Sequence, residues 1–296
     1  MSGPGRVLAV FERAWILLPV RGEPFSLVLP TVGDGPLNVV VAAPTGCFGH
    51  PAPGTTCDLS DGHLRVGDVD VDLSAAQVWE PCPSWRWLRG RLPQIQGQLD
   101  ELRSVGLQSA PDGSLLSLLP GAPQPGDGFE GSVLRSARQA GDALRAGWAG
   151  DESRTQKAAL QLAGLGPGLT PAGDDFLAGA MLWAWLAHPA PWAFCQGLAN
   201  AAALRTTALS AAVLRAAACG ECSAAWHELL NQLAAAKSKV LLTKTVVRVL
   251  SYGHTSGADT LAGFLWMGTG LFSVLHGATD RRSGDPPPRS RSANSH

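Results

Sequence analysis

Two short segments of the chain repeat one pattern, Gly-x-Asp-x-Leu-Ala-Gly, at residues 173–179 and again at residues 257–263. Each copy follows a turn rich in glycine, serine or threonine and opens an apolar run, which predicts a helix beginning at each copy. The small residues that close each copy would let two such helices pack closely. We therefore expect the two helix starts to face each other across a pseudo-symmetric pocket.

The turn before the first copy is rich in glycine and lies within residues 164–175. Gly166 and Gly168 suit positive φ angles, and Thr170 followed by proline is typical of a helix N-cap and first position. The amides that begin the helix, that of Gly173 among them, are expected to lack helical partners and to favour a bound phosphate or carboxylate. The glycine spacing fits neither a P-loop nor a dinucleotide-binding fingerprint.

Three acidic residues, Asp174, Asp175 and Asp259, stand in the first turns of these helices. Acids at helix starts complement the dipole and cap free amides, so the plainest interpretation is that they cap the turns and orient nearby hydroxyls. The alternative is a divalent metal held by the three carboxylates and bridging to an anion. We favour capping and predict no metal or other cofactor, with Asp175 and Asp259 as catalytic candidates and Asp174 as a ligand-binding candidate.

The turn before the second copy contains His254, Thr255 and Ser256 and leads into Gly257. His254 is the best candidate for acid–base or electrophilic work, since histidine titrates near neutral pH. A histidine hydrogen-bonded to backbone in a tight loop is an equally good interpretation. We expect the other three residues to contact the ligand.

Two residues elsewhere have side chains that suit an anion. Arg205 is expected within an apolar helix, 201–218, where it can snorkel to water, pair with an acid or bind an oxyanion through its planar guanidinium. Asn38 follows the turn 33–37 into a strand and either donates to a ligand or closes the turn.

The order of these patterns predicts an α+β fold, with a β-rich, barrel- or sandwich-like region at 1–130 and a helical bundle at 131–278 that carries both motifs. Short strands are expected at 6–10, 15–20, 25–29, 37–42, 64–71 and 77–79. Helices are expected at 95–105, 132–148, 154–163, 174–186, 191–218, 224–236, 239–250 and 259–275. Residues 279–296, rich in proline, serine and arginine, are expected to be disordered.

Composition excludes several classes of protein. With 23 Lys+Arg against 24 Asp+Glu, the chain has no basic excess with which to bind nucleic acid. We expect no signal peptide, because Glu12, Arg13 and Pro19 interrupt the first apolar runs, and the longest apolar runs fall short of a membrane span. The six cysteines are too few for a disulfide-stapled module, and the pair Cys219 and Cys222 lacks further zinc ligands. We expect a soluble cytoplasmic protein that binds neither nucleic acid nor membrane.

The motifs also resemble those of a bacterial family long catalogued as a domain of unknown function. The blocks that carry the resemblance are Gly-Leu-Gly-Pro-Gly-Leu-Thr-Pro-x-Gly-Asp-Asp at 164–175, Gly-His-Thr-Ser-Gly-x-Asp at 253–259 and Gly-Pro-Leu-Asn-Val-Val-Val at 35–41. One branch of this family is similar to the H subunit of oxamate carbamoyltransferase, from anaerobic allantoin breakdown, a purine degradation route. That enzyme converts oxalurate and phosphate to oxamate and carbamoyl phosphate together with two other subunits, one of them similar to acyl-CoA synthetases.

The resemblance implies a small anionic substrate such as carbamoyl phosphate or oxamate, and other carbamoyltransferase subunits as partners. The turn 166–173 would then hold the phosphate, and His254, Thr255 and Ser256 would lie near the carbonyl as hydrogen-bond donors. A different possibility is a non-catalytic subunit that binds an anion or acts as a scaffold while a partner carries out the chemistry.

Overall fold

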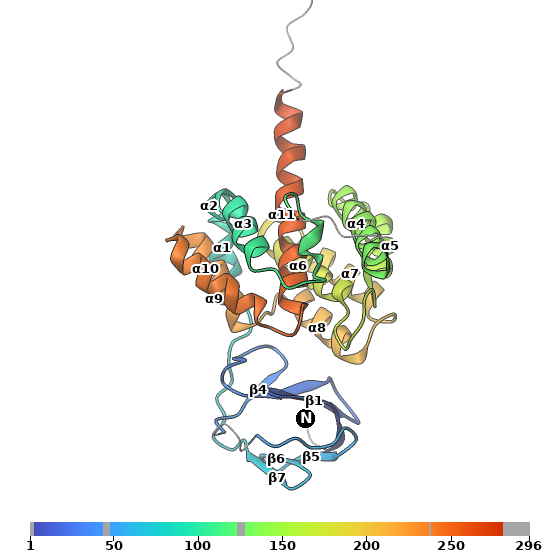
Figure 1. Cartoon of the computed structure of the whole chain (residues 1–296), viewed down its shortest axis with the longest axis vertical. Helices are drawn as coiled ribbons and strands as arrows, with labels where there is room; N and C mark the ends of the chain where they lie inside the picture. The colour runs from blue at the N-terminus through green and yellow to red at the C-terminus, as the bar shows by residue number, and fades with distance from the viewer. Residues whose placement is uncertain (1–2, 44–47, 123–127, 237, 281–296) are drawn as a thin grey trace, which may run out of the picture.

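A computed structural model describes the backbone of residues 3–43, 48–122, 128–236 and 238–280, and side chains as far as residue 270. The fold is α+β, as the sequence predicts: a curved sheet formed by the N-terminal residues lies at one end of a helical region (Figure 1). Within the described residues no helix combines the length and apolar character needed to cross a membrane.

Seven strands form a single half-barrel sheet in the order β4-β3-β2-β1-β5-β6-β7. The strands are β1 Gly3–Phe11, β2 Ala14–Pro19, β3 Phe25–Val28, β4 Asn38–Val40, β5 Thr56–Ser60, β6 His63–Val66 and β7 Val69–Asp72. All neighbours pair antiparallel except β3 and β4, which pair parallel. The concave face has its own apolar core, in which Trp15 stacks on Phe48 with ring centroids 4.5 Å apart.

Three strand predictions need correction. The run 64–71 is a hairpin of β6 and β7, because Gly67 adopts a φ of +56° and reverses the chain. The strand β5 was not predicted, since it alternates polar and apolar residues over only five positions. Residues 77–79 form no strand; Val78 there is fully exposed and has nothing to pack against.

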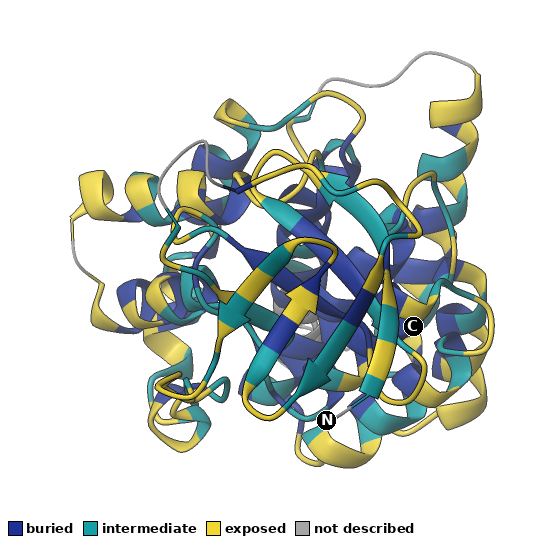
Figure 2. Cartoon of the chain, turned by 90° about the horizontal axis from the view of Figure 1, so that it is seen from below, coloured by how far each residue is buried: buried dark blue, intermediate teal, exposed yellow. Residues whose placement is uncertain are grey.

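The helical region has its own large apolar core around α6 and α11. Its helices are α1 Trp85–Arg89, α2 Leu92–Gly97, α3 Leu99–Gln108, the short 3-10 helix η1 Leu115–Leu118, α4 Phe129–Gly147, α5 Glu152–Leu162, α6 Ala172–Ala187, α7 Pro191–Ala202, α8 Ala208–Ala218, α9 Ala224–Ala235, α10 Lys239–Leu250 and α11 Ser256–Asp280. In Figure 1 the helix α11 runs through the centre of this region beside α6 and projects from the end opposite the sheet. Figure 2 views the molecule from the sheet side, with the strands in front of the helices.

Several helix predictions also change in detail. The expected helix 191–218 is two helices, α7 and α8, separated by a turn at residues 203–207. Helices begin as early as Trp85, although the division of the chain into domains at residue 130 stays a prediction. Of the predicted disordered tail, residues 279 and 280 continue α11, and residues 281–296 lie outside the described part of the chain.

Candidate active site

The two copies of the repeated motif lie side by side and make reciprocal contacts. A Cβ atom placed on Gly179 would lie 1.8 Å from the carbonyl oxygen of Thr260. One placed on Gly263 would lie 1.9 Å from the carbonyl oxygen of Phe176, which occupies the position in the first copy that Thr260 occupies in the second. The helices α6 and α11 therefore cross with their backbones in contact. The two helix starts lie together as predicted, but they pack directly against each other where the prediction placed a pocket between them, and binding of a ligand between them stays a prediction.

The turns before the two helices also meet. Thr170 and Ser256 share a hydrogen bond of 2.9 Å between their hydroxyl oxygens. The first glycine of each copy packs against the end of the preceding helix: a Cβ on Gly173 would lie 2.1 Å from the carbonyl oxygen of Leu162, and one on Gly257 would lie 1.9 Å from that of Val249. Each helix start is thus fixed by backbone contact on two sides.

Asp175 and Asp259 form a buried pair of carboxyl groups at this junction. Their exposed fractions are 5% and 0%, and one oxygen of each, Oδ2, has no hydrogen-bond partner. Burial raises the pKa of Asp259 to about 7, although the backbone amide of Leu115 donates to its Oδ1 over 2.7 Å and acts in the opposite direction. Burial, and next the charge of Asp259, raise the pKa of Asp175 well above its ordinary value, against hydrogen bonds from Ser256 and Thr170. The pair therefore retains a proton near neutral pH.

Asp174 has a different role from its neighbour. Its Oδ1 accepts a 3.2 Å hydrogen bond from the backbone amide of Gly164, and its Oδ2 accepts one from the hydroxyl of Thr206. The carboxyl group ties the glycine-rich turn to the start of α8, which is the capping and orienting role expected for it. Within the described residues no cluster of three or more His, Cys, Asp or Glu side chains is placed to hold a metal ion.

The glycine-rich turn is built differently from the anion site that we expected. Gly166 and Gly168 adopt φ angles of +105° and +99°, in agreement with the sequence. The amide of Gly173, however, donates to the carbonyl oxygen of Leu165 over 2.9 Å, so it is not free to bind an anion. Thr170 does not cap the helix either, because α6 begins after Pro171 and the Thr170 hydroxyl is used by Ser256.

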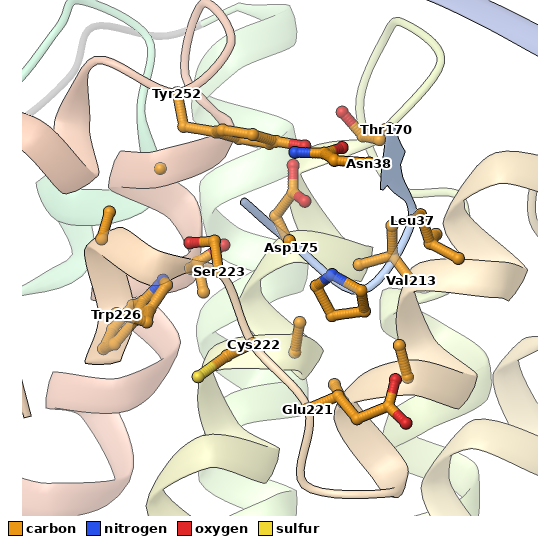
Figure 3. Close-up of a pocket in the computed structure, with 18 of the residues that line it drawn as sticks. Leu37, Asn38, Thr170, Asp175, Val213, Glu221, Cys222, Ser223, Trp226 and Tyr252 are labelled. Atoms are coloured by element: carbon orange, nitrogen blue, oxygen red, sulfur yellow. The ribbon is translucent and has the colours of Figure 1, made fainter. Parts of the chain in front are cut away.

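A cavity of about 150 Å³ opens beside Asp175, between the turn before β4 and the helices α6, α8 and α9. Figure 3 shows Asp175, Thr170, Asn38 and Tyr252 gathered at one end of it, with the side chains of Tyr252 and Asn38 drawn above the Asp175 carboxyl in this view. Asn38 also donates to the carbonyl oxygen of Gly33 over 2.9 Å, so it closes the turn as well as lining the cavity. Polar groups from three distant segments of the chain therefore converge on the Asp175 carboxyl.

Tyr252 is the member of this group that sequence analysis missed. Burial of its hydroxyl and the nearby charge of Asp175 raise its pKa, although the residue as a whole is 44% exposed. It stands directly before the second motif block at 253–259, and that adjacency was the one available signal.

Several predicted site residues lie away from the cavity. His254 is exposed in the turn between α10 and α11, and Arg205 is exposed in the turn between α7 and α8 and not within a helix. Gly168 lies in an exposed part of its turn. Neither Gly166 nor Thr255 is among the residues that line the cavity, whereas Gly257 is. The proposed roles of His254 and Arg205 stay predictions.

The charge of the cavity favours some ligand groups over others. Among the described residues that line it, Asp175 and Glu221 carry acidic side chains and none is lysine, arginine or histidine. An anion placed deep in such a cavity would meet repulsion from the acids and no neutralising cation. A neutral group with both donors and acceptors, such as an amide or carbamoyl group, suits it better.

Residues 162–268 match a family model described as oxamate carbamoyltransferase subunit AllH. The matched segment contains both copies of the motif and the helices α6, α8 and α9 beside the cavity. The match supports an AllH-like family and confirms the resemblance drawn from the motif blocks. No solved structure matches the chain.

Proposed function

We propose that this AllH-like chain is a subunit of a carbamoyl-transferring enzyme, and that it binds the carbamoyl or amide group of the substrate in the cavity beside Asp175. The observation that carries the proposal is the buried Asp175 carboxyl, which has one oxygen without a partner and lies within a group of neutral hydrogen-bonding side chains. A buried polar atom without a partner is unfavourable, and a ligand that satisfies it gains affinity.

The hydrogen-bonding groups match those of a carbamoyl group. The carbamoyl nitrogen has two N–H donors, which the carboxyl group of Asp175 at the cavity wall can accept. The carbamoyl oxygen needs donors, and the hydroxyl of Tyr252 and the second N–H of Asn38 lie at the same end of the cavity. These donors would stabilise the negative charge that develops on this oxygen when the carbon is attacked.

In the proposed reaction a phosphate oxygen attacks the carbamoyl carbon of oxalurate. The new C–O bond gives carbamoyl phosphate, and the C–N bond to the leaving nitrogen breaks to give oxamate. The phosphate loses one proton and the leaving nitrogen gains one, so a group that can both accept and donate a proton near pH 7 balances the step. The Asp175–Asp259 pair, whose pKa values are raised by burial, would carry this proton.

The phosphate itself would lie at the mouth of the cavity, near the turn 166–170 and the turn at 253–256, where His254 is exposed. Since the described lining residues include no cation, we propose that a partner subunit supplies the positive charge that phosphate needs. The same observation favours the second candidate, a subunit that binds the amide but leaves catalysis wholly to a partner.

The variant Asp175→Asn tests the binding site. We expect oxamate to raise the melting temperature of the wild-type chain and to bind the variant at least about tenfold more weakly, while the variant itself keeps its stability because it loses a poorly solvated carboxyl. Carbamoyl phosphate formation from oxalurate and phosphate, measured in the assembled complex, should fall by about 100-fold or more. The exposed Asp142→Asn is the matched control.

The outcomes separate the candidates. Loss of oxamate binding with unchanged activity in the complex would favour the non-catalytic subunit. Unchanged oxamate binding by Asp175→Asn would show that the cavity is not the binding site. An assembled complex that forms no carbamoyl phosphate would exclude this reaction for the chain.

A further inference from the structure

The cavity continues beyond the polar group at Asp175, and its remaining wall is mainly apolar. Leu209, Val213 and Ala217 come from successive turns of α8, and side chains four residues apart lie on one face of a helix. Leu182 of α6 and Trp226 of α9 face the same space. Figure 3 shows Val213 below the level of Asp175, on the way to Glu221 at the far end.

The face of α8 that carries Leu209, Val213 and Ala217 is held in place relative to the polar end of the cavity. The hydroxyl of Thr207, the N-cap of α8, donates to the carbonyl oxygen of Leu169 over 2.6 Å. This bond attaches the start of α8 to the turn that carries Thr170. The distance from the Asp175 carboxyl to the wall formed by Val213 is therefore set by the fold and not by a loose loop.

The charges at the two ends restrict what can lie along this wall. Asp175 stands at one end and Glu221 at the other, and no lysine, arginine or histidine is among the described lining residues. A second anionic group within the cavity would be repelled from both ends. Water molecules beside the apolar wall form no hydrogen bonds with it, so their displacement by the carbon atoms of a ligand is favourable.

Resting on the carbamoyl transfer proposed above, we infer that the cavity accepts amphipathic substrates besides oxalurate: an amide or ureido head held at Asp175, carrying an uncharged, non-polar substituent of several carbon atoms that lies along α8. Oxamate, which has no such substituent, would occupy the polar end alone. The substrate class is thus N-substituted or chain-bearing amides and ureides, with any carboxylate or phosphate outside the cavity mouth.

Calorimetric titration of the full chain with acetamide, butanamide and hexanamide tests this inference. Each methylene buried against the wall should strengthen binding about fourfold, corresponding to about 0.8 kcal/mol, until the cavity is filled. Equal affinity for all three amides would overturn the inference while leaving amide binding, and so the proposed function, intact. Absence of binding by all three amides and by oxamate would overturn both.

Two variants locate the substituent. Val213→Phe fills the space along the wall. It should remove the extra affinity for butanamide and hexanamide while leaving the affinity for acetamide unchanged. Val247→Phe, a matched change at an exposed position on α10, should leave the whole series unchanged. If Val213→Phe keeps the wild-type dependence on chain length, the substituent does not lie along α8 and the inference is wrong.

Discussion

Three carboxyl groups begin the two central helices, and their neighbours give them different chemistry. Asp174 accepts hydrogen bonds on both oxygens and holds the glycine-rich turn against the turn before α8. Asp175 and Asp259 each keep an oxygen without a partner and share a buried site, where like charges cannot both form easily. Asp175 and Asp259 are therefore suited to hold a proton and pass it on. A carboxylate whose oxygens all accept hydrogen bonds, such as that of Asp174, is not.

The variant Asp259→Asn should change how stability depends on pH. The pKa of Asp259 is about 7 in the folded chain and 3.8 ordinarily, so the folded state binds the proton more tightly. The stabilising contribution of the protonated side chain is complete below about pH 4 and is lost as pH rises to about 7, a difference of about 4 kcal/mol at most. The asparagine keeps the acceptor for Leu115 and lacks this dependence.

Urea unfolding at intervals from pH 4 to pH 8 measures the effect. The free energy of unfolding of the wild type, relative to Asp259→Asn, should decline across this range. A constant difference between the two proteins would mean that Asp259 titrates normally and that the pair holds no extra proton.

Part of this site was predictable at the level of single residues. Four predicted residues, Asp175, Thr170, Asn38 and Gly257, line the cavity. Three of them were predictable because motif glycines, first-turn acids and the residues before them mark helix starts, and Asn38 because it ends a turn that leads into a strand. Tyr252 could not be identified, since its place beside Asp175 depends on how two turns meet in space. Sequence analysis also could not show that the amide of Gly173 is occupied by Leu165, a bond made within the turn itself.

At the scale of secondary structure, the crossing of α6 and α11 is the feature most sensitive to side-chain size. Gly179→Ala would place a methyl group within 1.8 Å of a backbone carbonyl oxygen, which cannot move aside as a flexible side chain would. We expect the free energy of unfolding to fall by about 3 kcal/mol or more and the melting temperature to fall by about 6 °C or more.

Gly197→Ala is the matched control, because this glycine lies within α7 and a Cβ there meets nothing within 4 Å. It should leave stability unchanged or raise it by about 0.5–1 kcal/mol through helix propensity. Thermal unfolding of Gly179→Ala and Gly197→Ala, followed by circular dichroism, checks this prediction. Equal melting temperatures would show that the two central helices are not in backbone contact.

The helix α4 was predictable from its strong hydrophobic periodicity. The helices α6 and α11 are apolar on nearly all sides and were predictable because each is a long apolar run that follows a glycine-, serine- or threonine-rich turn. The break between α7 and α8 was missed because alanines stand on both sides of it and no proline or glycine marks it. The side-by-side placement of α6 and α11 was predictable, because the motif occurs twice and both copies end in small residues.

At the scale of the whole molecule, the sheet and the helices have separate apolar cores. Among the described contacts between them are a 3.0 Å hydrogen bond from the amide of Ala224 to the carbonyl oxygen of Asp34 and an exposed ion pair between Arg215 and Glu23. Exposed ion pairs contribute at most about 1 kcal/mol. The two regions are therefore expected to unfold with limited coupling.

Scanning calorimetry of the full chain should show two transitions, the lower one from the sheet, whose core is the smaller. Trp15→Ala removes a fully buried side chain from that core and should reduce the free energy of unfolding of the sheet by about 3–5 kcal/mol. Only the midpoint temperature of the lower transition should therefore fall. A single transition with equal calorimetric and van't Hoff enthalpies would show that the regions unfold as one unit.

The backbone contact between α6 and α11 also limits how the cavity can diversify. With Gly179 and Gly263 against opposing carbonyl groups, the spacing of the two acids admits almost no adjustment. The turn 33–38, by contrast, is contributed by the sheet and forms the facing wall. A change of sequence in the turn 33–38 would therefore alter the shape of the cavity without moving Asp175 or Asp259, which the contact between the two helices holds in place.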